Sequence, residues 1–549
     1  MKYCLLPVLI LIASCTGSVK PTETQNEARL PALDINVFRD HLAYIASDAL
    51  EGRQPSSLAE QRTITYIAAA FKDAGLSPGN GQDWFQQVPL VAVTATDVGP
   101  IQVTGMAALT QRQEAVVWTK RLVDEVSVDD SELVFVGYGI VAPEYNWNDY
   151  AGLDMTGKTA VILVNDPGFV GRDPNMFKGL AMTYYGRWTY KYEEAARQGA
   201  AAAIIIHETE AAGYPWDVVT GSWTGPQFDL IAPDRNQSRV AIEGWLREDA
   251  GRQLLAAAGQ DPAALMAAAA QLGFKAVPLG LSFSAGVVNE LEESLSNNVI
   301  GTLPGVSHPE ETVIYLAHWD HLGRDPSLTG DQIFNGAVDN ATGTAALLEI
   351  ARAFAAGRRP ARTVVFLSLT AEESGLLGSQ YYAANPVFPL ETTVAGFNID
   401  GMNVEGPTKD VVVVGYGSSE LEDDLRREAS RQGRVVVAEP TPEKGFFYRS
   451  DHFNFTKRGV PILYAESGID HRENGKAYGR RMGWEYNALR YHKVSDEYDP
   501  DWDLGGAIED MDLVYRIGWQ LANSRNFPEW YPGTEFKAIR DTTRASRQP

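Results

Sequence analysis

The chain is poor in cysteine and in positive charge, and each scarcity excludes a class of protein. Its 549 residues include only two cysteines, which excludes a disulfide framework and a cysteine-rich zinc site. The 47 lysines and arginines face 71 aspartates and glutamates, which leaves a net charge of −24. Such a chain repels nucleic acid, so we expect no nucleic-acid partner. Apolar residues make up 44% and charged residues 21%, as is typical of a globular protein.

The chain also lacks an apolar run of the ~20 residues that a transmembrane helix needs. The apolar run at residues 5–13 is shorter, follows Lys2 and leads into Ala13-Ser14-Cys15. Small residues directly before a cysteine resemble the lipobox of bacterial lipoproteins. The resemblance implies cleavage before Cys15 and lipidation of its sulfur, with a plain secretory signal as the alternative. We therefore expect a signal peptide at residues 1–14 and a polar tether at residues 15–33.

This resemblance also predicts where the protein resides. A lipid on Cys15 makes the membrane a partner and places the protein in the cell envelope. Thr16 stands where an aspartate would favour retention in the inner membrane. The expected location is therefore the outer membrane, facing the periplasm.

A set of short apolar segments predicts a separate α/β unit in the first half of the chain. Strands are expected at residues 133–136, 160–164 and 202–206, with a helix at residues 190–198 before the last of them. Together with the segments 136–139 and 157–161, this order resembles the protease-associated domain that is inserted in several exopeptidases. We expect the insert to span residues 127–279, and residues 34–126 and 280–549 to form one domain around it.

From residue 298 onward, short apolar strands alternate with helices. Strands are expected at residues 313–317, 363–369, 394–399, 411–414 and 461–464, and helices at residues 344–356 and 421–432. This alternation predicts an α/β fold with a mixed, mostly parallel sheet and helices on both faces. Three of the strands run directly into histidine or acidic residues. Ligands bind beyond the carboxyl ends of strands in such sheets, so we expect a site at that edge.

Five motifs supply polar side chains at the predicted edge. They are His318-Trp319-Asp320, the segment 336–343 with Asp339, the segment 371–379 with Glu372 and Glu373, Asn398-Ile399-Asp400, and Tyr491-His492. Their mixture of imidazoles and carboxylates suits zinc better than cobalt or manganese. Two ions ~3.5–4 Å apart need a shared carboxylate between them. Three carboxylates and two histidines satisfy that requirement.

The order of these motifs and the residues within them resemble the M28 family of zinc exopeptidases, of the leucyl aminopeptidase and glutamate carboxypeptidase type. The resemblance implies a metallo-exopeptidase with two zinc ions per chain and peptide substrates. It implies that Asp339 bridges the ions, that His318 and Asp400 complete one ion's ligands, and that Glu373 and His492 complete the other's. It also implies a cis peptide bond after Asp339.

The resemblance and the chemistry of the side chains together predict roles in catalysis for three further residues. Glu372 is implied as the general base, which takes a proton from metal-activated water and passes it to the leaving amine. Asp320 can accept the second ring N–H of His318 and fix its tautomer. Tyr491 matches a tyrosine that stabilises the tetrahedral intermediate in the carboxypeptidase branch, with a packed aromatic ring as the alternative.

Two other histidines lie near these motifs. His452, in Ser450-Asp451-His452, resembles a family motif that lines the substrate cleft, with a structural hydrogen bond as the alternative. His321 has no family role, and we expect it to be structural.

The leading hypothesis is an aminopeptidase that hydrolyses the N-terminal bond of peptides. A carboxypeptidase or dipeptidase on the same fold is the alternative, because four arginines could recognise a carboxylate: Arg449, Arg472, Arg480 and Arg481. A non-catalytic binding protein on this fold is a remote alternative, because it would lack ligands that are present here. The sequence predicts neither the oligomeric state nor the residue preference.

Overall fold

The computed structural model describes residues 30–223 and 225–545. Cys15, the expected signal peptide and all but the end of the expected tether lie outside the described residues. Within the described ranges, no helix combines the length and the apolar character that crossing a membrane would require.

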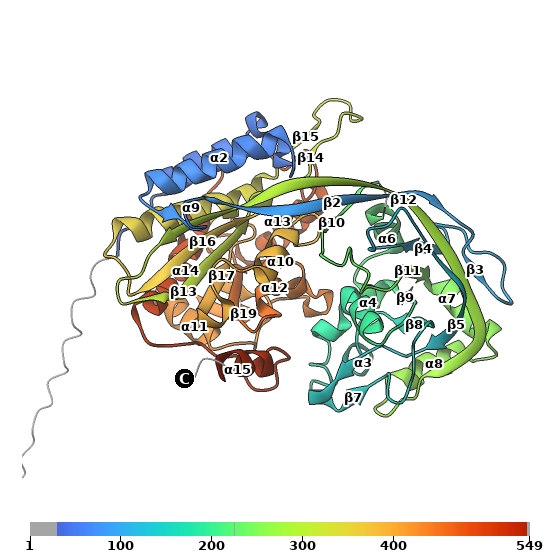
Figure 1. Cartoon of the computed structure of the whole chain (residues 1–549). Helices are drawn as coiled ribbons and strands as arrows, with labels where there is room; N and C mark the ends of the chain where they lie inside the picture. The colour runs from blue at the N-terminus through green and yellow to red at the C-terminus, as the bar shows by residue number, and fades with distance from the viewer. Residues whose placement is uncertain (1–29, 224, 546–549) are drawn as a thin grey trace, which may run out of the picture.

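The described chain forms two lobes that are joined by two long strands (Figure 1). The first lobe comprises residues 30–84 and 299–545, and the second comprises residues 99–286. The joining strands are β2 (Phe85–Val98) and β12 (Val277–Leu303), which pair antiparallel along the whole length of β2. The first lobe is therefore assembled from two distant parts of the sequence.

The first lobe contains a mixed sheet with a parallel centre. Its strand order is β19-β18-β20-β17-β13-β16-β12. The bounds are β13 (His308–His318), β16 (Arg362–Leu369), β17 (Thr393–Asn398), β18 (Asp410–Val413), β19 (Val435–Ala438) and β20 (Ile462–Ser467). The central strands β16, β13, β17 and β20 are parallel, whereas β12 and β18 run antiparallel to their neighbours β16 and β20. This arrangement confirms the predicted mixed, mostly parallel α/β sheet.

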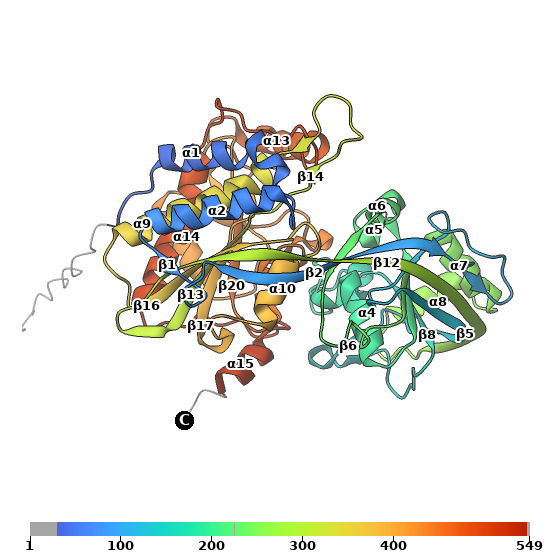
Figure 2. The same cartoon turned by 45° about the horizontal axis from the view of Figure 1, so that its top comes forward.

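Helices cover both faces of this sheet because the side chains of each buried strand alternate in direction. In β13, Tyr315 and Ala317 pack into one cluster, and Ile314 and Leu316 pack into another on the opposite face. The first cluster includes α1 (Ile35–Ile45), α2 (Leu58–Asp73), α9 (Gly343–Ala356), α11 (Leu421–Arg431) and α14 (Gly505–Asn523). The opposite cluster includes α10 (Leu377–Ala384) and α12 (His452–Thr456). Figure 2 shows α1, α2 and α9 side by side.

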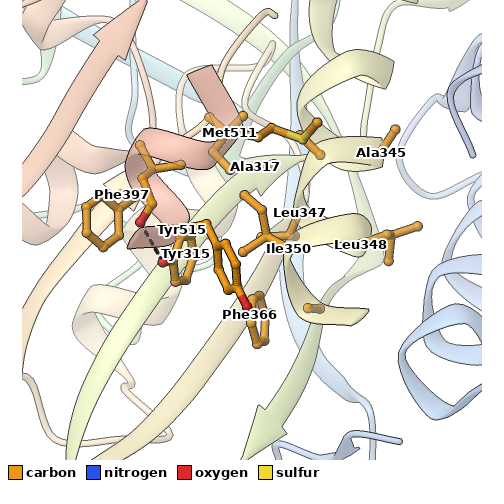
Figure 3. Close-up of a cluster of buried hydrophobic side chains, with 14 of the residues drawn as sticks. Tyr315, Ala317, Ala345, Leu347, Leu348, Ile350, Phe366, Phe397, Met511 and Tyr515 are labelled. Atoms are coloured by element: carbon orange, nitrogen blue, oxygen red, sulfur yellow. Dashed lines mark hydrogen bonds between the residues drawn. The ribbon is translucent and has the colours of Figure 1, made fainter. Parts of the chain in front are cut away.

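Figure 3 shows the centre of the first cluster, where Tyr315 packs among Phe366, Phe397 and Tyr515. The rings of Tyr315 and Phe397 stack with their centroids 4.9 Å apart. The buried Tyr315 hydroxyl donates a hydrogen bond of 2.8 Å to a main-chain carbonyl of α14, so burial leaves this hydroxyl paired. This packing holds β13, which leads directly to His318.

Local sequence signals account for the helix ends. Asp34 caps α1 by accepting a hydrogen bond from the backbone N–H of Asn36. Ser57 caps α2 in the same way through the N–H of Glu60. The helix α9 begins at Gly343, one residue before the predicted start, and ends at Ala356.

The second lobe contains its own parallel strands in the order β5-β8-β9-β11, with β4 antiparallel at the edge. The bounds are β4 (Ala115–Trp118), β5 (Glu125–Phe135), β8 (Thr159–Leu163), β9 (Ala202–His207) and β11 (Ile242–Arg247). The helices include α4 (Trp188–Arg197) and α7 (Glu248–Ala257). The second lobe begins earlier than the predicted boundary after residue 126, since β4 pairs with β11 and Ile101 and Val103 join this lobe's core.

Candidate metal centre

The predicted site residues meet at one edge of the first-lobe sheet. His318 ends β13, while Glu372 and Glu373 follow the end of β16, and Asp400 follows the end of β17. Asp339 lies in the turn Ala337–Thr342, directly before α9. The carboxyl ends of the parallel strands therefore gather these side chains, as the sequence pattern predicts.

One group of ligand atoms surrounds His318. Its Nε2 lies 3.3 Å from Oδ1 of Asp339 and 3.2 Å from Oδ1 of Asp400. Oε2 of Glu372 lies 4.0 Å from the same nitrogen. The His318 side chain is 1% exposed, so these charged groups face one another away from bulk water.

A second group surrounds His492, which follows α13 (Gly475–Leu489). Its Nε2 lies 3.3 Å from Oδ2 of Asp339 and 3.0 Å from Oε2 of Glu373. The two oxygens of Asp339 thus face different histidines. This is the arrangement that a carboxylate shared by two metal ions requires.

The donor atoms fit a divalent metal by their chemistry, and one of them has no hydrogen-bond partner among the described residues. Nε2 of His492 is buried and makes no hydrogen bond within the described part of the chain, although Glu373 is 3.0 Å away. Two separate sets of ligand atoms each converge within 4.8 Å: His318, Glu372 and Asp400, and His321, Asp339 and Glu373. The second set contains His321 in the place of the predicted ligand His492. Imidazole nitrogens together with carboxylate oxygens suit zinc.

Burial and mutual charge shift the acidity of this cluster. Burial raises the pKa of Glu372 well above its usual range, although the nearby His318 opposes the shift. Burial also disfavours the charged form of Asp339, but the facing imidazoles of His318 and His492 hold its pKa well below the usual range. Similarly, the hydrogen bond with His321 and the nearby imidazole of His492 offset burial and hold the pKa of Glu373 at about 2. The two adjacent glutamates therefore differ strongly in proton affinity, as suits a proton acceptor beside a ligand.

The part of the chain that carries this cluster matches a known protein family. Residues 298–515 match the Peptidase family M28. The matched residues include the five predicted metal ligands and Glu372.

Relatives match over parts of their length. Mouse Aminopeptidase NAALADL1 is 37% identical over 129 residues, which are 22% of this chain and 16% of the mouse protein. A Probable zinc metalloprotease of Pyricularia oryzae is 32% identical over 260 residues, which are 42% of this chain and 50% of that protein. The chain thus spans half or less of the length of these relatives. An aminopeptidase from Aneurinibacillus sp. strain AM-1 is 21% identical with a TM-score of 0.49, over 90% of this chain and 95% of that chain.

Asp320 lies beside His318, but its carboxylate has partners other than the predicted ring N–H of that histidine. Oδ1 accepts a hydrogen bond from the backbone N–H of Glu372 at 3.1 Å, and Oδ2 accepts one from the N–H of Glu373 at 3.4 Å. Nδ1 of His318 lies 3.2 Å from the backbone carbonyl of Asp320 and 3.7 Å from its carboxylate. The backbone of Asp320 therefore orients the histidine, and its side chain holds the two glutamates.

His321 also contacts a predicted metal ligand, which its sequence context does not indicate. Its Nδ1 lies 2.6 Å from Oε1 of Glu373, whose Oε2 faces His492. The hydrogen bond orients the glutamate toward the second group. In the sequence, only its position three residues after His318 points to this role.

Two carboxylate contacts that the sequence does not predict also stabilise the centre. The hydroxyl of Ser450 donates a hydrogen bond of 2.5 Å to Oδ2 of Asp400. Asp496 accepts hydrogen bonds from the backbone N–H groups of Val338 and Asp339, at 3.1 and 3.2 Å. Both contacts join segments far apart in the sequence, which is why no local pattern reveals them.

The remaining predicted residues differ in placement. The ring of Tyr491 stacks on His492 with centroids 3.9 Å apart, and its side chain is partly exposed beside the centre. His452, in contrast, is completely buried between Phe447 and Tyr464. It offers no surface to a cleft, and its two ring nitrogens have no hydrogen-bond partner in the described chain. The structure therefore supports neither the predicted substrate contact nor the structural hydrogen bond of His452.

The predicted cis peptide bond between Asp339 and Asn340 is present. The side-chain carbonyl of Asn340 accepts hydrogen bonds from the N–H groups of Gly343 and Gly401, each at 2.9 Å. The residue after the bridging position thus connects the start of α9 to the loop that carries Asp400.

Proposed function

We propose that the protein is a zinc aminopeptidase that binds two zinc ions and hydrolyses the N-terminal bond of peptides. The observation that carries the proposal is the placement of Asp339, whose two oxygens face separate histidine and carboxylate groups. The match of residues 298–515 to Peptidase family M28 supports it. The aminopeptidase name of the mouse relative favours the amino-terminal specificity.

In this proposal, His318, Asp339 and Asp400 hold one ion, while Asp339, Glu373 and His492 hold the other. Zinc supplies Lewis-acid chemistry, which polarises the scissile carbonyl and makes water a stronger nucleophile. Glu372 takes the proton of the attacking water and delivers it to the leaving amine, because its buried carboxyl binds a proton readily. Asp320 holds Glu372 in place through its backbone N–H. Tyr491 donates a hydrogen bond to the oxyanion.

A carboxypeptidase or dipeptidase remains the second candidate, and the arginines bear on it. Arg472 is paired with Glu509 at 2.8 Å, and Arg481 lies 3.8 Å from Glu485, so acidic side chains already neutralise these two. Arg449 has no such partner among the described residues and lies near the centre. A non-catalytic binding protein is disfavoured, because the complete ligand set and the base are present.

Substrate comparison with and without metal tests the proposal. The purified protein should cleave aminoacyl-nitroanilides and unblocked peptides, lose activity to a chelator and regain it with zinc. Cleavage of N-blocked peptides alone would refute an aminopeptidase, and full activity after metal removal would refute the metal mechanism.

Replacement of the base provides a sharper test. Glu372→Gln should keep two zinc ions per chain but lose ~10²–10⁴-fold in kcat. The exposed Glu310→Gln in the same lobe is the matched control and should stay near wild type. A normal kcat in the Glu372 variant would exclude it as the base.

The proposal extends to the rest of the chain. The second lobe is a protease-associated domain, supported by its parallel α/β order and by the motifs in residues 136–161. Cys15 carries the lipid that anchors the enzyme in the outer membrane. Labelled fatty acid should therefore enter the wild-type protein in cells but not the Cys15→Ser variant, which should fractionate with the soluble proteins.

A further inference from the structure

One buried carboxylate, that of Glu535, joins the two lobes. Its side chain belongs to the first lobe and is 3% exposed. Oε2 lies 3.1 Å from Nζ of Lys178, and Oε1 accepts a hydrogen bond of 3.3 Å from the backbone N–H of Tyr184. Lys178 and Tyr184 both belong to the second lobe. The carboxylate is thus bound by a side chain and by the backbone of the opposite lobe, which fixes the segment 178–184.

The same carboxylate also binds the first-lobe turn Phe446–Tyr448. The hydroxyl of Tyr448 lies 3.1 Å from Oε1 of Glu535 and 3.1 Å from the backbone carbonyl oxygen of Met182 in the second lobe. Its single proton is therefore shared between one acceptor from each lobe. Glu535 and Tyr448 together with the segment 178–184 form one polar contact, which we call the interlobe junction.

Close packing holds the interlobe junction in one arrangement. The ring of Tyr184 packs edge-on against Phe453, with centroids 5.1 Å apart, and Met182 lies in the same buried cluster as Tyr448. Gly445 has a φ of +61°, and a Cβ there would lie 2.5 Å from Sδ of Met182. The lobes therefore approach too closely for a side chain at residue 445. Polar groups buried in such a cluster need their partners, so the junction is expected to form as a whole.

The junction lies two residues before a contact of the metal centre. Ser450 is 3% exposed, and its hydroxyl donates a hydrogen bond of 2.5 Å to Oδ2 of Asp400. The same hydroxyl accepts a hydrogen bond of 2.7 Å from the side-chain N–H of Asn398. The other oxygen of Asp400 lies 3.2 Å from Nε2 of His318. The position of Tyr448 thus determines where the Ser450 hydroxyl lies, and this hydroxyl orients the carboxylate toward the histidine.

We infer that Glu535 and Tyr448 are positioning residues of the metal centre, through which the docked second lobe holds Ser450 against Asp400. The inference rests on the proposed function, in which Asp400 binds one of two zinc ions. It deepens that function, because it gives the second lobe a role in metal binding. A ligand that is oriented in advance binds its metal more tightly. Since coupling is reciprocal, the bound metal must in turn stabilise the junction.

The first test measures the affinity of each zinc ion by competition with a chelator. Ser450→Ala removes the direct contact and should weaken the binding of one ion by about 10- to 100-fold. Tyr448→Phe and Glu535→Gln nearly keep the shapes of their side chains. Each should weaken the binding of that same ion by about 3- to 10-fold, because it acts one step further from the ligand. Asp541→Asn removes an exposed ion pair with Lys537 in the same C-terminal region, and as the matched control it should change neither affinity.

A double variant separates positioning from a general loss of stability. If Tyr448 acts through Ser450, Tyr448→Phe should have no further effect on zinc affinity once Ser450 is alanine. A general structural effect would instead add to that of Ser450→Ala and would weaken the binding of both ions. Additive effects, or an equal loss of affinity for both ions, would overturn the inference.

Hydrogen exchange tests the reverse direction without any turnover. Zinc added to the metal-free wild type should slow exchange in peptides that contain Tyr184 by about 3- to 10-fold, and this effect should disappear in Ser450→Ala. A protein that shows this protection but cleaves no peptide would support the inference and refute the peptidase. Two bound ions with unchanged exchange at Tyr184 would overturn the inference and leave the proposed function intact. A wild type that binds no zinc would refute both.

Discussion

Replacing Asp320 by asparagine tests whether one buried carboxylate positions both glutamates of the metal centre. The Asp320 side chain is fully buried, and its two oxygens accept hydrogen bonds from the N–H groups of Glu372 and Glu373. Asparagine has nearly the same shape but only one acceptor oxygen. Its amide NH₂ would face the other N–H, so one backbone donor would lose its partner.

The expected loss follows from that single bond. A hydrogen bond to a charged group contributes about 1.5–3 kcal/mol, and a buried donor left unpaired costs a comparable amount. If the transition state loses this free energy of stabilisation, kcat/KM falls about 10- to 150-fold, since 1.36 kcal/mol corresponds to a factor of ten. Zinc affinity should fall by about 10- to 100-fold, because Glu373 also shifts.

The assay measures kcat/KM on an aminoacyl-nitroanilide at saturating zinc, and zinc affinity by competition with a chelator. Asp325→Asn is the control, since Asp325 also accepts a backbone N–H, from Ser327, but on an exposed loop. That variant should retain both values. Wild-type kcat/KM and zinc affinity in Asp320→Asn would refute the positioning role of this carboxylate.

Three further predictions follow from the same geometry. Asp339→Asn should lose both zinc ions, whereas Asp400→Asn should keep one, as elemental analysis of the dialysed proteins would show; two retained ions in the first variant would contradict the bridge. Arg53→Met removes four hydrogen bonds from a buried guanidinium group to backbone carbonyls. The free energy of unfolding in urea should therefore fall by about 3–5 kcal/mol, whereas the exposed Arg62→Met should change it little. Burial lowers the pKa of His452 to about 3, so the folded protein keeps it neutral while the unfolded chain protonates below about pH 6.5. Stability should therefore fall by about 1.4 kcal/mol per pH unit from pH 6.5 toward 3, and His452→Phe should remove that component; an unchanged pH dependence of unfolding would contradict it.

Much of the fold was predictable because its signals are local. Strands such as β13 and β16 are short apolar runs, and α1 carries its own capping residue, Asp34. The carboxyl ends of parallel strands share one edge, so residues that follow the strands could be assigned to one site. The boundary of the second lobe was less predictable, since β4 joins this lobe by pairing with β11, far away in the sequence.

The sequence by itself determined which chemical groups are present: two histidines and four carboxylates, several of them at strand ends, in a chain with few cysteines and an excess of acid. Local patterns suffice for this, because residue types and strand positions are properties of short segments. Only the tertiary structure decided which oxygen faces which nitrogen, that Asp320 holds the glutamates, and that His452 is buried. It alone brought Lys178 of the second lobe to Glu535 of the first, because contacts between distant segments depend on the packing of the two lobes.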